Sequence, residues 1–213
     1  MAQLEFSVLD IIAEPFAAAP QLTARLRVTE STGAVIHAMA LRCQVRIQPQ
    51  RRGYTPAEEE GLLDLFGARL RWPSTLKPFL WMQCSTLVQG FTGETEADLP
   101  LPCTYDFDVA AAKYLHALRE RSIPVEFLFS GTVFTQGLAG FGVEQVPWDR
   151  EASFQLPVAT WTGLMEQHFP HSGWIRVDKD VLAALAHYKS ALGLTSWEAA
   201  IEGLLAGAGD PAQ

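Results

Sequence analysis

Apolar and polar side chains alternate without interruption between Val35 and Ile47, and this stretch limits what the chain can fold into more than any other. Successive side chains of a β-strand point to opposite faces, so a sustained period of two predicts one long strand with a buried and a solvated face. Arg42 and Arg46 fall on the solvated face, and Pro49 ends the strand because proline cannot donate to a ladder. The set predicted to point inward is Val35, His37, Met39, Leu41, Cys43, Val45 and Ile47.

Similar segments predict further strands at residues 5–12, 21–28, 79–91, 99–107, 125–135 and 152–156. The strand at 79–91 is apolar on both faces at its start, which is typical of a central strand. Pro100 and Pro102 place the strand at 99–107 at a sheet edge. We therefore predict a mainly β fold, an antiparallel β-sandwich with a crossover helix and C-terminal α-helices, α+β in total content.

Capping signals predict where the helices begin. Thr55, Pro56 and Glu58 form a capping box that predicts a helix near 56–66, and Asp108 is predicted to cap the crossover helix near 109–121. From residue 159 the apolar side chains recur at helical spacing. We predict a single domain over residues 1–213, with a β-sandwich core at 1–157 and a C-terminal helical segment at 158–206.

Composition excludes several classes of protein. Residues are 48% hydrophobic and 19% charged, and no apolar run approaches the roughly 20 residues of a membrane span, so we expect no membrane insertion. The net charge of -8 argues against nucleic acid as a general partner. Three widely spaced cysteines and an N-terminus without the features of an export signal predict a reducing cytoplasm.

Four arginines and two tryptophans are the candidate partner surface. If residues 29–34 form a hairpin turn, Arg25 and Arg27 lie beside Arg42 and Arg46 on one sheet face. Such a patch would dock an acidic partner, while the alternative interpretation is an ordinary solvated sheet face. Trp72 and Trp148 occur near prolines at loop boundaries, where they could form an exposed recognition surface.

Catalytic and metal motifs are weak in this sequence. Glu166, His168 and His171 are the best metal-like cluster, but Pro170 breaks the helix that would set their geometry. Glycines at 137, 140 and 142 have the wrong offsets for a dinucleotide loop, and the cysteines lack C-x-x-C spacing. We predict no catalytic residue, no metal site and no cofactor.

Several longer motifs resemble those of a known family. The stretch at 37–54, HAMALRCQVRIQPQRRGY, is followed by TLKPF at 75–79, GFTGETE at 90–96, LPCTYDF at 101–107, LFSGTVF at 128–134 and VEQVPW at 143–148. Together they resemble an uncharacterised bacterial, actinobacterial family in the domain-of-unknown-function series, number 6084. No catalytic residues are assigned to that family. Its members resemble proteins encoded beside nickel-iron hydrogenase genes, which implies an accessory role in hydrogenase assembly or maturation.

Residues and resemblance together favour a non-enzymatic protein-binding accessory factor. Its partner would be a hydrogenase subunit or a maturation factor, and self-association into a homo-oligomer stays open. One alternative is a metal carrier or metal-dependent enzyme that uses Glu166, His168 and His171. A second alternative is a client-binding chaperone, which would need an extended exposed groove.

Overall fold

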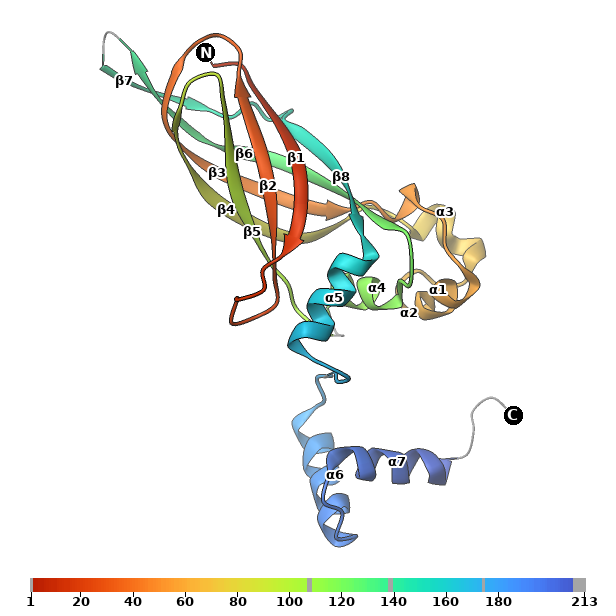
Figure 1. Ribbon diagram of the computed structural model, residues 1–213. Coiled ribbons are helices and arrows are strands. Elements are labelled where there is room, and N and C mark those ends of the chain that lie inside the picture. The colour runs from red at the N-terminus through yellow and green to blue at the C-terminus, as the bar shows by residue number, and fades with distance from the viewer. Residues whose placement is uncertain (1, 107–108, 138–139, 174, 209–213) are drawn as a thin grey trace. The chain divides into compact units, whose positions relative to one another are not determined.

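Figure 1 shows the computed structural model of the chain, which describes residues 2–106, 109–137, 140–173 and 175–208. The contacts within it divide the chain into two compact units, residues 1–174 and 175–213. The boundary lies after the first C-terminal helix, so residues 158–168 belong with the sheets rather than with the last two helices.

Two antiparallel sheets form the first unit, as the sequence predicts. Sheet A has the strand order β1-β2-β5, and sheet B has the order β4-β3-β6-β7, with β8 also pairing with β6. Every pair of neighbouring strands is antiparallel. The described strands are β1 (Leu4–Ala13), β2 (Gln21–Glu30), β3 (Val35–Ile47), β4 (Phe79–Phe91), β5 (Glu94–Pro102), β6 (Ser122–Gly137), β7 (Gly140–Gln145) and β8 (Glu151–Pro157).

Short helices gather at one end of the sheets in Figure 1. The chain passes from β5 of sheet A through α4 to β6 of sheet B, so α4 is the predicted crossover helix. It ends at Ala117, earlier than predicted, because Leu118 has extended backbone. The predicted cap Asp108 lies outside the described residues. These helices are α1 (Pro56–Gly61), α2 (Leu63–Phe66), α3 (Trp72–Thr75), α4 (Ala110–Ala117) and α5 (Val158–His168), with 3-10 turns at Pro49–Arg51 and Arg69–Arg71.

The capping box at Thr55 is confirmed. The Thr55 side chain accepts from the Glu58 N–H, and the Glu58 carboxylate accepts from the Thr55 N–H at 2.9 Å. The helix predicted over 56–66 is nevertheless broken into α1 and α2 at Leu62, whose φ of -102° and ψ of 0° depart from helical values.

The turn at residues 29–34 is not the predicted hairpin. It carries the chain from sheet A to sheet B, because β2 pairs with β1 and β5 whereas β3 pairs with β4 and β6. The apolar faces of β2 and β3 are both fully buried in the common core, which requires them to lie in separate layers. The Glu30 carboxylate fixes this turn by accepting backbone N–H groups from Gln3, Thr32 and Ala34 at 3.1, 3.0 and 2.9 Å.

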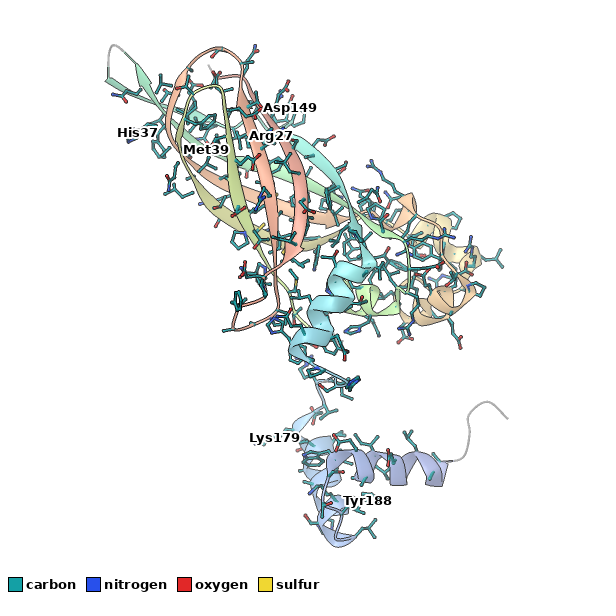
Figure 2. All side chains as sticks on the ribbon, viewed as in Figure 1. Arg27, His37, Met39, Asp149, Lys179 and Tyr188 are labelled. Atoms are coloured by element: carbon teal, nitrogen blue, oxygen red, sulfur yellow. The ribbon has the colours of Figure 1, made fainter. Side chains whose placement is uncertain are left out.

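A β-bulge overturns the predicted orientation at the start of β3. The register with β6 shifts between Ile36 and Ala38, so Ile36 is buried while His37, labelled in Figure 2, is exposed. One extra residue moves the following side chains to the opposite face. Val35 is consequently exposed as well, and the predicted alternation holds from Met39 to Ile47.

Strand positions also differ from the prediction in two places. β4 lies at an edge of sheet B rather than at its centre. Its first residues are apolar because Phe79 packs on the helical end, with ring centroids 5.5 Å from Tyr114 and 6.4 Å from Phe66. β5 begins at Glu94 instead of residue 99, and it lies at an edge of sheet A, as its prolines predict.

The second unit contains two helices, α6 (Lys179–Ala191) and α7 (Trp197–Ala208). The Asp178 side chain caps α6 by accepting from the Asp180 N–H at 2.9 Å, as the sequence predicts. Gly193 turns the chain with a φ of +65°, a conformation that favours glycine. In the part of the chain described here, no helix combines the length and the apolar character needed to cross a membrane.

Candidate protein-binding surface

The four arginines predicted to share one face do not come together. Arg25 and Arg27 lie on β2 in sheet A, and Arg42 and Arg46 lie on β3 in sheet B. Outward-facing residues of two packed sheets occupy opposite surfaces of a sandwich. The predicted four-arginine patch is therefore wrong, and its error follows from the mistaken hairpin.

Three of these arginines are already neutralised by carboxylates. Arg27 lies 3.0 Å from Glu96 and 3.2 Å from Glu94, and Arg25 lies 3.8 Å from Asp98. All three acids belong to β5, beside β2 in sheet A. Arg46 lies 3.8 Å from Glu126 on β6, whose side chain is only 12% exposed. These charges stabilise the sheets locally and leave little cationic surface for a partner.

Arg42 differs from the other three. Its side chain is exposed, and within the described ranges it has no carboxylate partner. Its neighbours in register are Ser85 on β4 and Ser130 on β6, and the short serine side chains leave the guanidinium accessible from both sides. Gln44 on β3 pairs with Gln83 on β4, beside Arg42 and Ser85.

These polar side chains line a shallow hollow of about 350 Å³ on the outer face of sheet B. We call this set, Arg42, Gln44, Gln83, Ser85 and Ser130, the Arg42 surface. A guanidinium donates two parallel hydrogen bonds to a carboxylate, and glutamine amides and serine hydroxyls can add both donors and acceptors. The arrangement fits an acidic side chain or a polar extended peptide.

Two exposed leucines flank the Arg42 surface on β4. Leu87 is 68% exposed and Leu80 is 48% exposed. Leu87 lies opposite Ala40, and Leu80 lies opposite Arg46, so both side chains belong to the outer face of sheet B. An apolar margin around a charged centre provides burial in addition to polar recognition.

The two candidate tryptophans differ in their exposure to solvent. Trp72 is buried, because its indole Nε1 donates to the Gly67 carbonyl at 3.0 Å and its ring meets the Tyr54 ring at 5.0 Å. The prediction that it forms an exposed surface is therefore wrong. Trp148 is 93% exposed between β7 and β8, as expected for a recognition residue.

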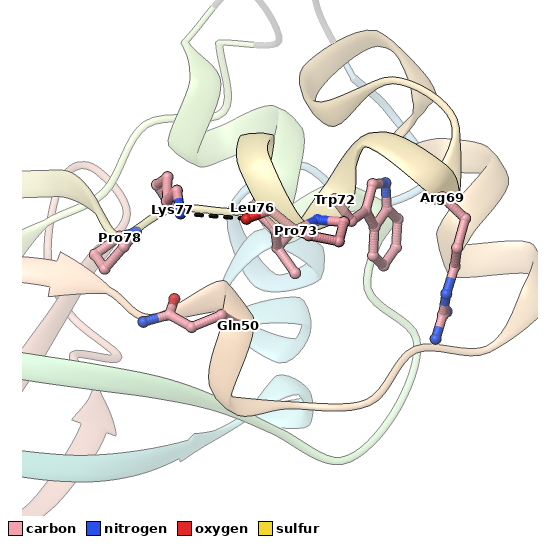
Figure 3. A pocket seen from close by; sticks show the side chains of 7 residues that line it. All are labelled: Gln50, Arg69, Trp72, Pro73, Leu76, Lys77 and Pro78. Carbon is pink, nitrogen blue, oxygen red and sulfur yellow. Dashed lines mark hydrogen bonds between the residues drawn. The ribbon is translucent and has the colours of Figure 1, made fainter.

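A larger hollow of about 630 Å³ lies at the helical end (Figure 3). Its two cations are already engaged: Arg69 pairs with Glu59 and lies 5.1 Å from the Trp72 ring centroid, and Lys77 Nζ donates to the Pro73 carbonyl at 3.2 Å. We therefore regard it as a weaker binding candidate than the Arg42 surface. It is lined by Gln50, Arg69, Trp72, Pro73, Leu76, Lys77 and Pro78.

The metal-like cluster is only partly assembled. The Glu166 carboxylate accepts from the His171 N–H at 3.2 Å and lies 3.5 Å from His171 Nδ1. His168 Nε2 is buried without a hydrogen-bond partner. No group of three histidine, cysteine, aspartate or glutamate side chains among the described residues is placed to hold a metal ion.

Sequence reasoning missed a buried ionic network near the end of β3. Arg52 Nη2 lies 2.8 Å from Glu58 Oε1, and the two side chains are 4% and 0% exposed. Burial alone would raise the pKa of Glu58, but hydrogen bonds from the Arg119 and Thr55 N–H groups and the charge of Arg52 outweigh it and lower the pKa. The capping box shows Glu58 in the sequence, but nothing there identifies Arg52 as its partner.

Two tyrosines extend this network. The Tyr54 hydroxyl donates to the Pro49 carbonyl at 2.7 Å and lies 2.8 Å from the Tyr114 hydroxyl. Burial raises the pKa of Tyr114 to about 12, so both hydroxyls remain protonated at neutral pH. The network joins the end of β3 to α1 and α4, and we interpret it as structural because it lines neither hollow.

Comparison with solved structures finds only distant similarity. A β-glucosidase from Kluyveromyces marxianus gives a TM-score of 0.25 at 10% identity, over 72% of this chain and 15% of that one. β-Glucosidase 3B from Thermotoga neapolitana gives a TM-score of 0.26 at 14% identity, over 72% and 17%. This chain spans less than a fifth of either enzyme, and these scores support no functional argument.

Among curated proteins, no sequence matches this chain. The motifs between residues 37 and 148 nevertheless resemble one family, and the model of that family matches residues 1–213. The chain belongs to the family of unknown function DUF6084.

Proposed function

We propose that this protein is a non-enzymatic accessory factor that binds another protein through the outer face of sheet B. The observation that carries this proposal is the Arg42 surface, where an exposed arginine has no carboxylate partner among the described residues and lies in register between Ser85 and Ser130, with Gln44 and Gln83 beside it. An unpaired guanidinium at the centre of a sheet can bind an acidic group without first breaking an existing ion pair.

The shape of the surface favours a protein segment over a small molecule. Small-molecule sites are usually concave and enclose most of the ligand. The Arg42 surface is instead a shallow hollow on a sheet, with the exposed side chains of Leu80 and Leu87 on the same face. A partner that places an acidic residue over Arg42 could cover both leucines.

The resemblance described above suggests the class of partner. Proteins of this kind resemble those encoded near nickel-iron hydrogenase genes, so we propose a hydrogenase subunit or a maturation intermediate. We also propose that the complex forms in the cytoplasm, because all three cysteines are free thiols.

Affinity capture from the native host tests this proposal. Tagged wild-type protein should bring down one partner in near-stoichiometric amount, quantified by mass spectrometry. Arg42→Glu should reduce that amount at least about tenfold, which corresponds to roughly 1.4 kcal/mol. Arg25→Glu is the matched control, because it makes the same charge change on sheet A.

Association kinetics with the purified partner then test the electrostatic argument. The Arg42→Glu variant should associate more slowly than wild type, and the difference should shrink as salt rises from about 20 to 300 mM. Equal binding by wild type and Arg42→Glu at low salt would contradict the proposed role of this surface. Many partners in substoichiometric amounts would favour a client-binding chaperone instead.

A further inference from the structure

Two of the three cysteines lie directly opposite each other on neighbouring strands. Cys43 on β3 is the register partner of Cys84 on β4, and these two antiparallel strands lie side by side in Figure 1. Opposite residues of an antiparallel pair project from the same face of the sheet, with Cβ atoms about 4.5–5.5 Å apart. Both side chains therefore belong to the inner face of sheet B, where Cys43 is buried in the core and Cys84 is partly buried.

The two sulfur atoms approach the same short stretch of β3. Cys84 Sγ lies 3.7 Å from the Cys43 carbonyl oxygen, and Cys43 Sγ lies 3.6 Å from the Gln44 carbonyl oxygen. A thiol is a weak donor, so these contacts do little to oppose a rotation of either side chain. Directly paired residues have Cα atoms about 4.5 or 5.5 Å apart, within the roughly 4.4–6.8 Å that a disulfide spans. A sulfur–sulfur bond can therefore form with little movement of the strands.

The two thiols differ in acidity and in access. A hydrogen bond from the Cys43 thiol lowers the pKa of Cys84, although burial opposes this effect. The same hydrogen bond, together with burial, raises the pKa of Cys43. Cys84 also lies on an edge strand of sheet B and is less buried than Cys43. An accessible thiol of lowered pKa beside a second thiol is the usual arrangement of redox-sensing cysteines.

The third cysteine lacks these features and provides an internal reference. Cys103 follows the last residue of β5, in sheet A, and its Sγ lies 3.4 Å from the Leu101 carbonyl oxygen. Burial raises the pKa of Cys103 to about 12, so its reactive thiolate is scarce at neutral pH. Cys43 and Cys84 both belong to sheet B, and neither is its register partner.

We propose that Cys43 and Cys84 are a reversible modification site for hydrogen peroxide, at which Cys84 is oxidised and Cys43 converts the product to a disulfide. The Cys84 thiolate attacks one peroxide oxygen, the O–O bond breaks, and the leaving hydroxide takes up a proton as water. The Cys43 sulfur then attacks the sulfur of the Cys84 sulfenic acid, and the S–O bond breaks. The departing hydroxide takes the Cys43 proton and leaves as a second water. The two thiols lose two electrons in total, and the disulfide ties edge strand β4 covalently to β3.

Thiol counting on the full chain tests the proposal. The protein is treated with a few equivalents of hydrogen peroxide, quenched in acid, and unfolded in urea that contains N-ethylmaleimide. Wild type should lose two of its three reactive thiols, and peptide mapping should find Cys43 linked to Cys84. Dithiothreitol should restore all three thiols. Cys103→Ala is the matched control and should form the same disulfide.

Single variants separate the two roles. In Cys43→Ala, a small side chain keeps the core position, and peroxide should leave on Cys84 a sulfenic acid that dimedone traps. In Cys84→Ala, Cys43 should remain a thiol at the same peroxide dose, because its side chain is buried. Iodoacetamide should alkylate Cys84 of the folded wild type at least about tenfold faster than Cys103.

Several results would overturn the proposal. In wild type these are three alkylated thiols after peroxide treatment, a disulfide that includes Cys103 or a second chain, and a Cys84 sulfinic acid beside an intact Cys43 thiol. A sulfenic acid trapped on Cys43 in Cys84→Ala would overturn the assigned roles. The thiol count uses wild type alone, so a variant that fails to fold does not affect it.

Discussion

Replacing Glu58 with glutamine should destabilise the first unit, although the two side chains differ by only one heavy atom. The Glu58 carboxylate accepts from Arg52 Nη2 and the Arg119 N–H through Oε1, and from the Thr55 N–H through Oε2. Glutamine keeps one carbonyl oxygen, but its NH₂ group must then face an N–H donor. It also leaves the charge of Arg52, which is 4% exposed, without a counter-charge.

The expected size of this loss follows from the contacts. A hydrogen bond to a charged group contributes about 1.5–3 kcal/mol, and breaking a buried ion pair costs about 3–5 kcal/mol. Because glutamine retains part of the bonding, we expect Glu58→Gln to lower the free energy of unfolding by about 2–3 kcal/mol. Glu58→Ala, which retains none of it, should lower it by about 3–5 kcal/mol.

Urea denaturation at pH 7 measures both values, with the emission of the buried Trp72 and Trp161 as the probe. With a slope near 2 kcal/mol/M, Glu58→Gln should move the midpoint down by about 1–1.5 M. Glu60→Gln on the same helix is exposed and should change stability by less than about 0.5 kcal/mol. A loss below about 1 kcal/mol for both Glu58 variants would refute the view that this network stabilises the fold.

Two further predictions concern a close backbone contact and a half-buried histidine. A Cβ at Gly131, where φ is +146°, would lie 2.2 Å from the Ala40 carbonyl oxygen, so Gly131→Ala should cost more than about 2 kcal/mol in the same assay. Gly163→Ala, with open space in α5, should be neutral or stabilising. Burial and the charge of Arg119 lower the pKa of His116 to about 4, below its unfolded value near 6.5. The unfolded chain therefore binds this proton at a higher pH than the folded chain does, and the free energy of unfolding should fall as pH drops from 6.5 towards 4. In melting experiments across this range, the His116→Phe variant should lose less stability than wild type. The same dependence of melting temperature on pH in both proteins would contradict the role assigned to His116.

The sequence predicts the class of fold because that class depends on local patterns. Period-two alternation shows the strands, and the capping box at Thr55 and the cap at Asp178 show two helix starts. Prolines in β5 correctly predict an edge strand. Each of these signals depends on neighbours within a few residues, so it can be read without knowing the tertiary contacts.

The partners of each strand depend on contacts that a linear pattern does not contain. A turn at residues 29–34 is compatible with a hairpin or with a crossing between sheets, and only the burial of both apolar faces decides between them. That choice separates Arg25 from Arg42 and leaves Arg42 without a carboxylate partner in the described chain. The burial of Trp72 likewise depends on Tyr54 and Gly67 lying beside it.

The pairing of β3 with β6 has a consequence for the protein during its synthesis. Ile47 precedes its partner Val125 by 78 residues, and the other pairs of this ladder are still further apart in sequence. At about 5–20 residues per second, a ribosome needs roughly 4–16 s to make the intervening chain. Throughout that interval one edge of β3 has no partner strand, so the nascent chain is most prone to wrong strand pairing before residues 122–137 emerge.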